Sequence, residues 1–145
     1  KKNREALKNM GGMPNIKSQI KGSLQAKDPR VGTWTFTPNH CTSGERQGFF
    51  GVHLTSKNGK GWARVIKEST GRMAVTVPLR AEGEESNQGV VLRKCKVLEG
   101  NVARTNTRVN RIWMVQGRVK IDCALDHKDG KKGRVWGELE FKNCH

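Results

Sequence analysis

The stretch SKNGKGWARVIKE, residues 56 to 68, combines residue types that bind a polyanion. Its Asn58-Gly59 pair predicts a two-residue hairpin turn, because both central positions of that turn need a positive φ. Trp62 and Arg64 follow with the same parity, so in a strand their side chains point to one face. If that face is exposed, the indole can stack on a base while the guanidinium binds phosphate. The alternative is the solvent-exposed edge of a hairpin, whose charges only prevent aggregation between strands.

Two further groups of basic residues lie in the second half of the chain. In RTNTRVNR, residues 104 to 111, arginines stand among hydroxyl and amide side chains that also donate to phosphate oxygens. Basic residues then line the polar face of the next expected strand, and HKDGKKGR follows at residues 127 to 134. The predicted nucleic-acid-binding residues are Lys57, Lys60, Trp62, Arg64, Arg104, Arg108, Arg111, Arg118, Lys120, Lys128, Lys131, Lys132 and Arg134. Trp136 is a second candidate for base stacking, because it shares the parity of the polar residues in its strand.

The whole chain has a strong excess of positive charge. Lys and Arg number 28 and Asp and Glu number 13, which gives a formal net charge of +15 in 145 residues. The excess is spread along the chain, so the folded body, and not only a basic arm, must present positive surface. An anionic partner is therefore expected.

Nucleic acid is the favoured partner, in the form of RNA or single-stranded DNA. The sequence has no RNP, KH or zinc-knuckle pattern, which predicts contacts to phosphate with little base specificity. An anionic membrane surface attracts the same side chains, and acidic polysaccharide or a protein partner is the alternative for a secreted module. Self-association into a homo-oligomer is compatible with each of these partners.

The four cysteines, Cys41, Cys95, Cys123 and Cys144, allow three disulfide pairings. A chain of this length forms a core without staples, so we expect reduced cysteines that pack as small apolar residues. Disulfides and a zinc site remain as alternatives. No Cys-x-x-Cys pair occurs, and we expect neither a metal nor a cofactor.

No sequence motif indicates catalysis. The segment TSGERQG, residues 42 to 48, is not a nucleophile elbow, and residues 56 to 62 lack the arrangement of a P-loop. His40 is poorly placed to activate Cys41, since neighbours on an extended chain point to opposite faces, and His53 would have to reach it through the fold. We therefore expect a protein that is not an enzyme.

The spacing of apolar residues divides the chain into a short arm and one β domain. In residues 1 to 30, apolar residues at helical spacing are interrupted by glycine and proline, which predicts a basic N-terminal arm, partly helical or flexible. Residues 31 to 145 alternate apolar and polar residues, which predicts an antiparallel β-sandwich or barrel-like domain. The expected strands are 32 to 37, 49 to 55, 62 to 68, 73 to 79, 90 to 98, 102 to 109, 112 to 125 and 134 to 142. Asp129-Gly130 predicts a second two-residue turn, and the acidic stretch 80 to 89 predicts an exposed loop.

Together these features favour a strongly basic binding or structural protein without enzymatic activity. Its composition is similar to that of viral coat, matrix and movement proteins, which implies a structural role on a nucleic acid. The alternatives are a structural protein on an acidic membrane surface and a secreted β module stapled by disulfides. No apolar stretch approaches the roughly 18 residues of a membrane span, and an intracellular location is slightly favoured over secretion.

Overall fold

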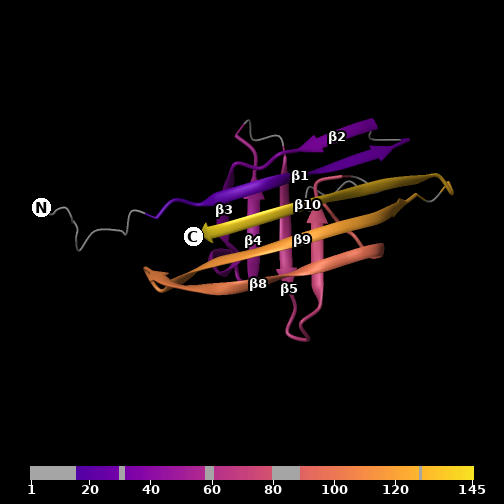
Figure 1. The fold of residues 1–145 in the computed structure, drawn as a ribbon. Helices are drawn as coiled ribbons and strands as arrows, with labels where there is room; N and C mark the ends of the chain where they lie inside the picture. Colours follow the sequence, from indigo (N-terminus) through magenta and orange to yellow (C-terminus); the bar gives the residue numbers. More distant parts are fainter. Residues whose placement is uncertain (1–15, 30–31, 58–60, 80–88, 128) are drawn as a thin grey trace, which may run out of the picture.

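The computed structural model describes residues 16–29, 32–57, 61–79, 89–127 and 129–145 as two antiparallel β-sheets (Figure 1). The first sheet has the strand order β2-β1-β10-β9-β8, and the second has the order β3-β4-β5-β6-β7. The first sheet consists of β1 (Gln19–Asp28), β2 (Gly32–Phe36), β8 (Lys94–Val109), β9 (Ile112–Asp126) and β10 (Lys132–Cys144). The second consists of β3 (His40–Ser43), β4 (Gly51–Thr55), β5 (Trp62–Lys67), β6 (Met73–Val77) and β7 (Val90–Val91). A 3₁₀ helix, η1 (Gly44–Gln47), connects β3 to β4.

The two sheets pack face to face, with the long strands β8, β9 and β10 running across the shorter strands β4 and β5 (Figure 1). Alternation along each strand directs one set of side chains into the space between the sheets. In β9 this set is Val115, Val119, Ile121, Cys123 and Leu125, each at most 3% exposed. From the opposite sheet, β4 and β5 contribute Val52, Leu54, Ala63 and Val65. This apolar burial between the layers is the main stabilising term of the fold.

The predicted fold class is confirmed, because the chain is mainly β and its two antiparallel sheets form a sandwich. The expected strands are present as β2, β4, β5, β6, β9 and β10, with small shifts at their ends. The region from 90 to 109 differs, since β7 is a separate two-residue strand and β8 runs unbroken through the expected gap after residue 98. Strand β3 was not expected, because four residues are too few to show a period.

The helical interpretation of the N-terminal arm is wrong for Gln19–Asp28, which form strand β1 between β2 and β10. The positions Ile16, Ile20 and Leu24 are four residues apart, a spacing that suits one face of a helix. Because four is even, the same spacing also suits one face of a strand, and Leu24 is fully buried on that face. Residues 1–15, the rest of the expected arm, lie outside the described residues. Within the described part of the chain, no helix is long and apolar enough to cross a membrane.

The two predicted hairpins are present, and one differs in its turn. Strands β4 and β5 pair as expected, while the Asn58-Gly59 turn itself lies outside the described residues. In the β9–β10 hairpin, the N–H of His127 donates to the carbonyl of Lys131 at 3.0 Å, so the loop that this hydrogen bond closes is longer than the predicted two-residue turn. Gly130 occupies the left-handed position of this loop with φ 87°, where a side chain would be strained.

The expectation of reduced cysteines is wrong, because all four cysteines form disulfides. Cys41 of β3 is bonded to Cys144 of β10 and therefore joins the two sheets, with 5.1 Å between the Cα atoms. Cys95 of β8 lies directly opposite Cys123 of β9 and is bonded to it within one sheet. The inward position of Cys123 was predicted correctly, but the pairing depends on strand register, which the sequence does not reveal.

Candidate nucleic-acid interface

Trp62 and Arg64 lie together on the outer face of the second sheet. Burial alternates along β5, with Ala63 and Val65 fully buried and Trp62 and Arg64 half-buried. The neighbouring position on β4, opposite Arg64, is His53. The indole and the guanidinium therefore share one accessible face of the sheet, as their parity predicts, and both interpretations of this hairpin allow that arrangement.

Arg64 is held by several neighbours on this face. Its Cζ lies 5.5 Å from the ring centroid of Trp62 and 5.7 Å from that of Phe49. Its Nε donates to Nδ1 of His53 at 3.4 Å, and the ring of His53 stacks on Trp62 with 6.1 Å between centroids. Cation–π contacts at such exposed sites contribute about 0.5 to 1 kcal/mol each, so the guanidinium is positioned before any ligand arrives.

The surroundings of His53 shift its pKa. Burial of the imidazole lowers the pKa of His53, and the positive charges of Arg64 and His40 lower it further. A neutral imidazole leaves Nδ1 able to accept the proton of the Arg64 Nε. An anion bound at Arg64 would offset the part of this pKa lowering that comes from the charge of Arg64.

A second group of arginines and rings lies where the β8–β9 hairpin passes η1. The Cζ of Arg104 is 6.0 Å from the ring centroid of Phe50 and 5.8 Å from that of Trp113. Arg108 lies opposite Trp113 in the strand register, with its Cζ 5.7 Å from the same ring. Arg104 also forms an ion pair with Glu45 of η1 at 2.7 Å.

The two groups are linked through the chain, because Arg64 contacts Phe49 and Arg104 contacts the next residue, Phe50. We define the arginine–aromatic strip as Phe49, Phe50, Trp62, Arg64, Arg104, Arg108 and Trp113. The two arginines of β8 and the pair on β5 were predicted site residues, whereas the other three rings were not. The phenylalanines stand at the start of an expected strand, and Trp113 has core parity, so nothing in the sequence placed them beside arginines.

Two more arginines flank the strip. Arg111, a predicted site residue, is exposed at the tip of the β8–β9 hairpin with φ 69°. Arg46, which the sequence did not single out, donates from Nε to the main-chain oxygen of His145 and from Nη2 to its Nδ1 at 2.8 Å. The Nε2 of His145 lies 2.8 Å from the carbonyl oxygen of Val109, so Nε2 carries the proton and Nδ1 accepts.

Within the described residues, few carboxylates contact the strip. Among the described residues, Glu45 is the carboxylate in contact with it, through Arg104. Arg64 and Arg108 have no carboxylate partner within the described ranges. Of the three arginines of the strip, Arg104 is thus the one that the described residues pair with a carboxylate.

The predicted site residues Arg118 and Lys120 are placed differently, on the outer face of the first sheet among carboxylates. Arg118 lies opposite Glu140 on β10, and Lys120 lies between Glu99 of β8 and Glu138 of β10. These acids are distant in the sequence and are brought there by the register, so the cluster is less positive than its sequence indicates. Neither residue is part of the strip.

Three predicted lysines, Lys57, Lys60 and Lys128, fall outside the strands in the sequence. Lys57 is exposed just after β4. Lys60 and Lys128 lie outside the described residues.

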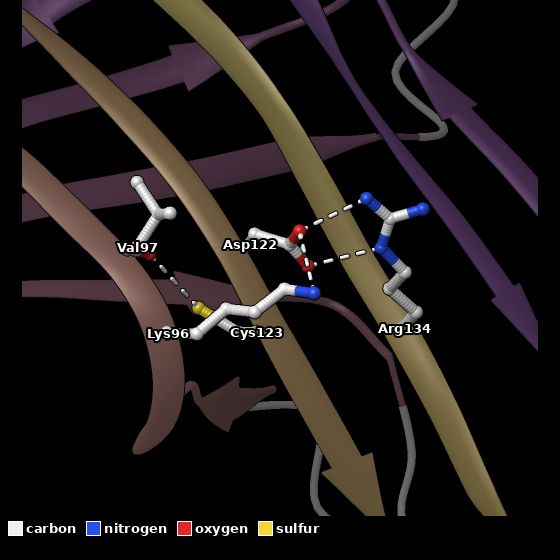
Figure 2. A network of polar contacts seen from close by, with 5 residues as sticks. All are labelled: Lys96, Val97, Asp122, Cys123 and Arg134. Carbon is white, nitrogen blue, oxygen red and sulfur yellow. Dashed lines mark hydrogen bonds and ion pairs between the residues drawn. The ribbon is translucent and has the colours of Figure 1, made fainter.

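Lys131, Lys132 and Arg134 form a separate basic cluster at the β9–β10 end of the first sheet. Arg134 donates from Nε and Nη2 to the two oxygens of Asp122, each at 2.9 Å. Figure 2 shows Lys96 approaching the same carboxylate from β8, with 3.7 Å between its Nζ and Oδ2. The hydrogen bonds from Arg134 hold the pKa of Asp122 below its ordinary value, with smaller effects from the charges of Arg134 and Lys96.

Part of this cluster was not predicted from the sequence. Lys27 of β1 lies opposite Arg134, and Lys94 of β8 faces Ala124, the β9 partner of Arg134, from the other side. Trp136, expected on the outer face, is half-buried there, with the Cζ of Arg134 4.4 Å from its ring centroid. Since β1, β8 and β10 are far apart in the chain, only the strand order could have shown that their basic residues form one row.

Comparisons with protein-family models, with curated proteins and with solved structures found no match for this chain. Among the residues that the structure describes, no three His, Cys, Asp or Glu side chains are grouped closely enough to hold a metal ion. Function is therefore inferred from the geometry of the strip and of the basic cluster.

Proposed function

We propose that this protein binds single-stranded nucleic acid, RNA or DNA, through the arginine–aromatic strip and with little base specificity. The supporting observation is the interleaving of charge and rings, since Arg64, Arg104 and Arg108 each lie within 6.0 Å of a ring centroid. Arginine presents a planar fork that can bind phosphate with two hydrogen bonds and can stack on a flat ring. The strip thus offers contacts to phosphate and to bases side by side, with no enzymatic step.

The rings favour a single strand over other polyanions. The bases of a duplex are stacked inside the helix, whereas a single strand presents them to aromatic side chains at about 1 to 3 kcal/mol per stacked base. An anionic membrane interacts with the arginines but gains no base stacking. Binding without base selection suits a protein that coats or carries a nucleic acid, which is the role favoured by the composition.

Acidic polysaccharide is the second candidate, and the disulfides are the observation in its favour. Two disulfides are typical of proteins that fold in an oxidising compartment, where carboxylated and sulfated polysaccharides are available partners. Such a polymer binds through its charges alone, so the contribution of Trp62 separates the two candidates.

The test is a set of binding isotherms with a fluorescent single-stranded oligonucleotide and with heparin over a range of salt. The variant Arg64→Gln/Arg108→Gln should lower the slope of log affinity against log salt by about 1.4, at roughly 0.7 per lost phosphate contact. The control, Arg118→Gln/Lys120→Gln, removes the same charge from the mixed face and should leave the slope unchanged.

Trp62 tests the stacking component. Trp62→Ala should weaken oligonucleotide binding by about 1 to 3 kcal/mol, while Trp62→Phe, which keeps a ring on the folded sheet, should retain most of it. Heparin binding should change little in both variants. Equal slopes for the strip variant and the control, or no retention of the oligonucleotide at low salt, would refute the proposal, and a Trp62 effect absent for both ligands would favour polysaccharide.

A further inference from the structure

The β9–β10 end of the first sheet has a surface hollow of about 620 Å³ beside Trp136. We define the Trp136 hollow by its lining residues, Lys27, Asp28, Pro29, Lys131, Lys132, Gly133, Arg134 and Trp136. Its side chains combine the same kinds of group as the strip, an indole and a guanidinium with further cations. The hollow is large enough to admit a nucleotide unit of a bound strand.

Arg134 and Trp136 form a fixed stack in this hollow. Both oxygens of Asp122 accept from Arg134 at 2.9 Å (Figure 2). These bonds hold the guanidinium in place, with its Cζ 4.4 Å from the ring centroid of Trp136. Asp122 balances the charge of Arg134, so Arg134 acts as a flat stacking surface more than as a net cation. A base can stack on such a planar pair, as it does on aromatic and guanidinium planes in other single-strand sites.

The net positive charge of the hollow comes from its lysines. Lys27, Lys131 and Lys132 are exposed, and within the described residues none of their ammonium groups has an ion-pair partner. By contrast, Lys94 just outside the hollow is paired with Asp126 at 2.6 Å. The three lysines therefore remain available for phosphate.

The base of the hollow is fixed by a buried pair. Nε2 of His127 and Oδ1 of Asp28 are 2.6 Å apart, and both side chains are fully buried. Gly133 makes room for this contact, since a Cβ at that position would lie 2.1 Å from the Asp28 oxygen. The pair ties the end of β1, and with it Lys27, to the β9–β10 connection.

The hollow and the β8–β9 part of the strip, Arg104, Arg108 and Trp113, lie near opposite ends of the long strands of the first sheet. The hairpin carrying Arg108 begins β9, and the connection carrying Lys131 follows its end (Figure 1). The 15 residues of β9 extend over about 45 Å at roughly 3.3 Å per residue. The mixed row around Lys120, with Glu99 and Glu138, lies between the two ends and separates them.

We propose that the Trp136 hollow is a second contact site for single-stranded nucleic acid, so that one protein molecule holds two segments at once. This inference rests on the proposed function of the strip. Two sites at opposite ends of one rigid sheet let the protein connect two strands or fold one long strand on itself. The site requires a base on the Arg134–Trp136 stack and phosphates at the three lysines.

Stoichiometry tests the second site directly. A hexanucleotide, chosen so that one molecule does not reach both ends, is titrated against the protein at low salt. The wild type should bind two, and Lys131→Gln/Lys132→Gln, two exposed substitutions, should bind one with the affinity of the strip. Arg64→Gln/Arg108→Gln should lose the strip site and keep the other, while Arg118→Gln/Lys120→Gln should still bind two.

A bridging assay tests the consequence. Protein bound to an immobilised strand should retain a second, labelled strand from solution, and Lys131→Gln/Lys132→Gln should reduce this retention at least tenfold without releasing the protein. Sedimentation of the protein without nucleic acid shows whether it is a monomer. Bridging that persists in the lysine variant would mean that a dimer links the strands through two strips and would overturn the second site.

The outcomes separate this inference from the proposed function. A wild-type stoichiometry of one that is lost in Arg64→Gln/Arg108→Gln overturns the hollow and leaves the strip intact. A stoichiometry of one that is lost only in the lysine variant overturns the strip and assigns binding to the hollow alone. No binding by the wild type overturns both.

Discussion

At the scale of single residues, the strip is built before a ligand arrives. Arg64 is held by Trp62, Phe49 and His53, and Arg108 is held by Trp113. A long side chain that is already ordered loses less conformational entropy on binding, at about 0.5 to 1.5 kcal/mol for each such side chain. Under the proposed function the rings therefore have two roles, as stacking surfaces for bases and as supports for the guanidinium groups.

His53 gives a prediction on pH. Its pKa in the folded protein is lowered from 6.5 by burial and by Arg64, so the unfolded chain binds the proton more readily than the folded chain does. The free energy of unfolding should therefore fall as the pH drops below about 6.5 and stop falling below the folded pKa. Chemical denaturation of wild type and His53→Gln across pH 5 to 8 measures this, because the glutamine amide oxygen can still accept from Arg64.

The difference between the two proteins isolates His53, since the other histidines are unchanged in both. The variant should lose less stability on acidification than the wild type. Parallel curves for the two proteins would show that His53 does not couple folding to protons.

At the scale of elements, the two disulfides connect different parts of the fold. Cys41–Cys144 closes a separation of 103 residues and joins the sheets, whereas Cys95–Cys123 closes 28 residues within one hairpin. In the chain-entropy description, a loop of about 100 residues gives about 4.7 kcal/mol and one of about 15 residues gives about 3 kcal/mol. Replacing Cys41 and Cys144 by alanine should therefore cost more stability than replacing Cys95 and Cys123.

Urea denaturation of the two double variants measures this order. Each double variant replaces two bonded cysteines by two alanines, so each variant is the control for the other. A larger loss from the Cys95/Cys123 variant would show that packing in the β8–β9 hairpin outweighs loop closure.

A feature of these elements can be predicted from the sequence when neighbouring residues determine it, and it cannot when it depends on which distant segments pair. Parity within a strand is local, so the outward position of Trp136 and the shared face of Trp62 and Arg64 were predicted correctly. Strand order is not local, and for that reason the row from Lys27 through Arg134 to Lys94 was missed. The cysteine pairs were missed for the same reason, because each bond depends on which strands become neighbours.

Strand β1 shows a different kind of failure. Its apolar residues are four apart, a spacing that both periods allow, and the glycines and proline before it favoured a broken helix. The structure has β1 as an interior strand, paired to β2 and to β10. Pairing on both sides supplies backbone hydrogen bonds that no local pattern could indicate.

At the scale of the whole molecule, the formal net charge of +15 opposes the compact state. The exposed ion pairs, such as Lys94–Asp126, offset little of this, since water and salt screen the attraction between exposed charges. Salt screens the repulsion, because the Debye length falls from about 30 Å at 0.01 M to about 10 Å at 0.1 M. The melting temperature of the protein without nucleic acid should therefore rise with salt over this range.

With a saturating concentration of a single-stranded oligonucleotide, the melting temperature should instead fall as salt is added. A ligand at 100 times its Kd stabilises the folded state by about 2.7 kcal/mol, and salt weakens that binding through the phosphate contacts. The complex should therefore melt highest at 0.01 M and approach the protein without ligand as salt is added. Arg118→Gln/Lys120→Gln, which lowers the net charge without touching the strip, should flatten the curve of the protein alone and leave the stabilisation by the strand intact. Thermal melts of the wild type and of this variant, each with and without oligonucleotide over the salt range, measure these responses. A salt response of the same sign with and without the strand would show that the positive charge is not what the strand neutralises.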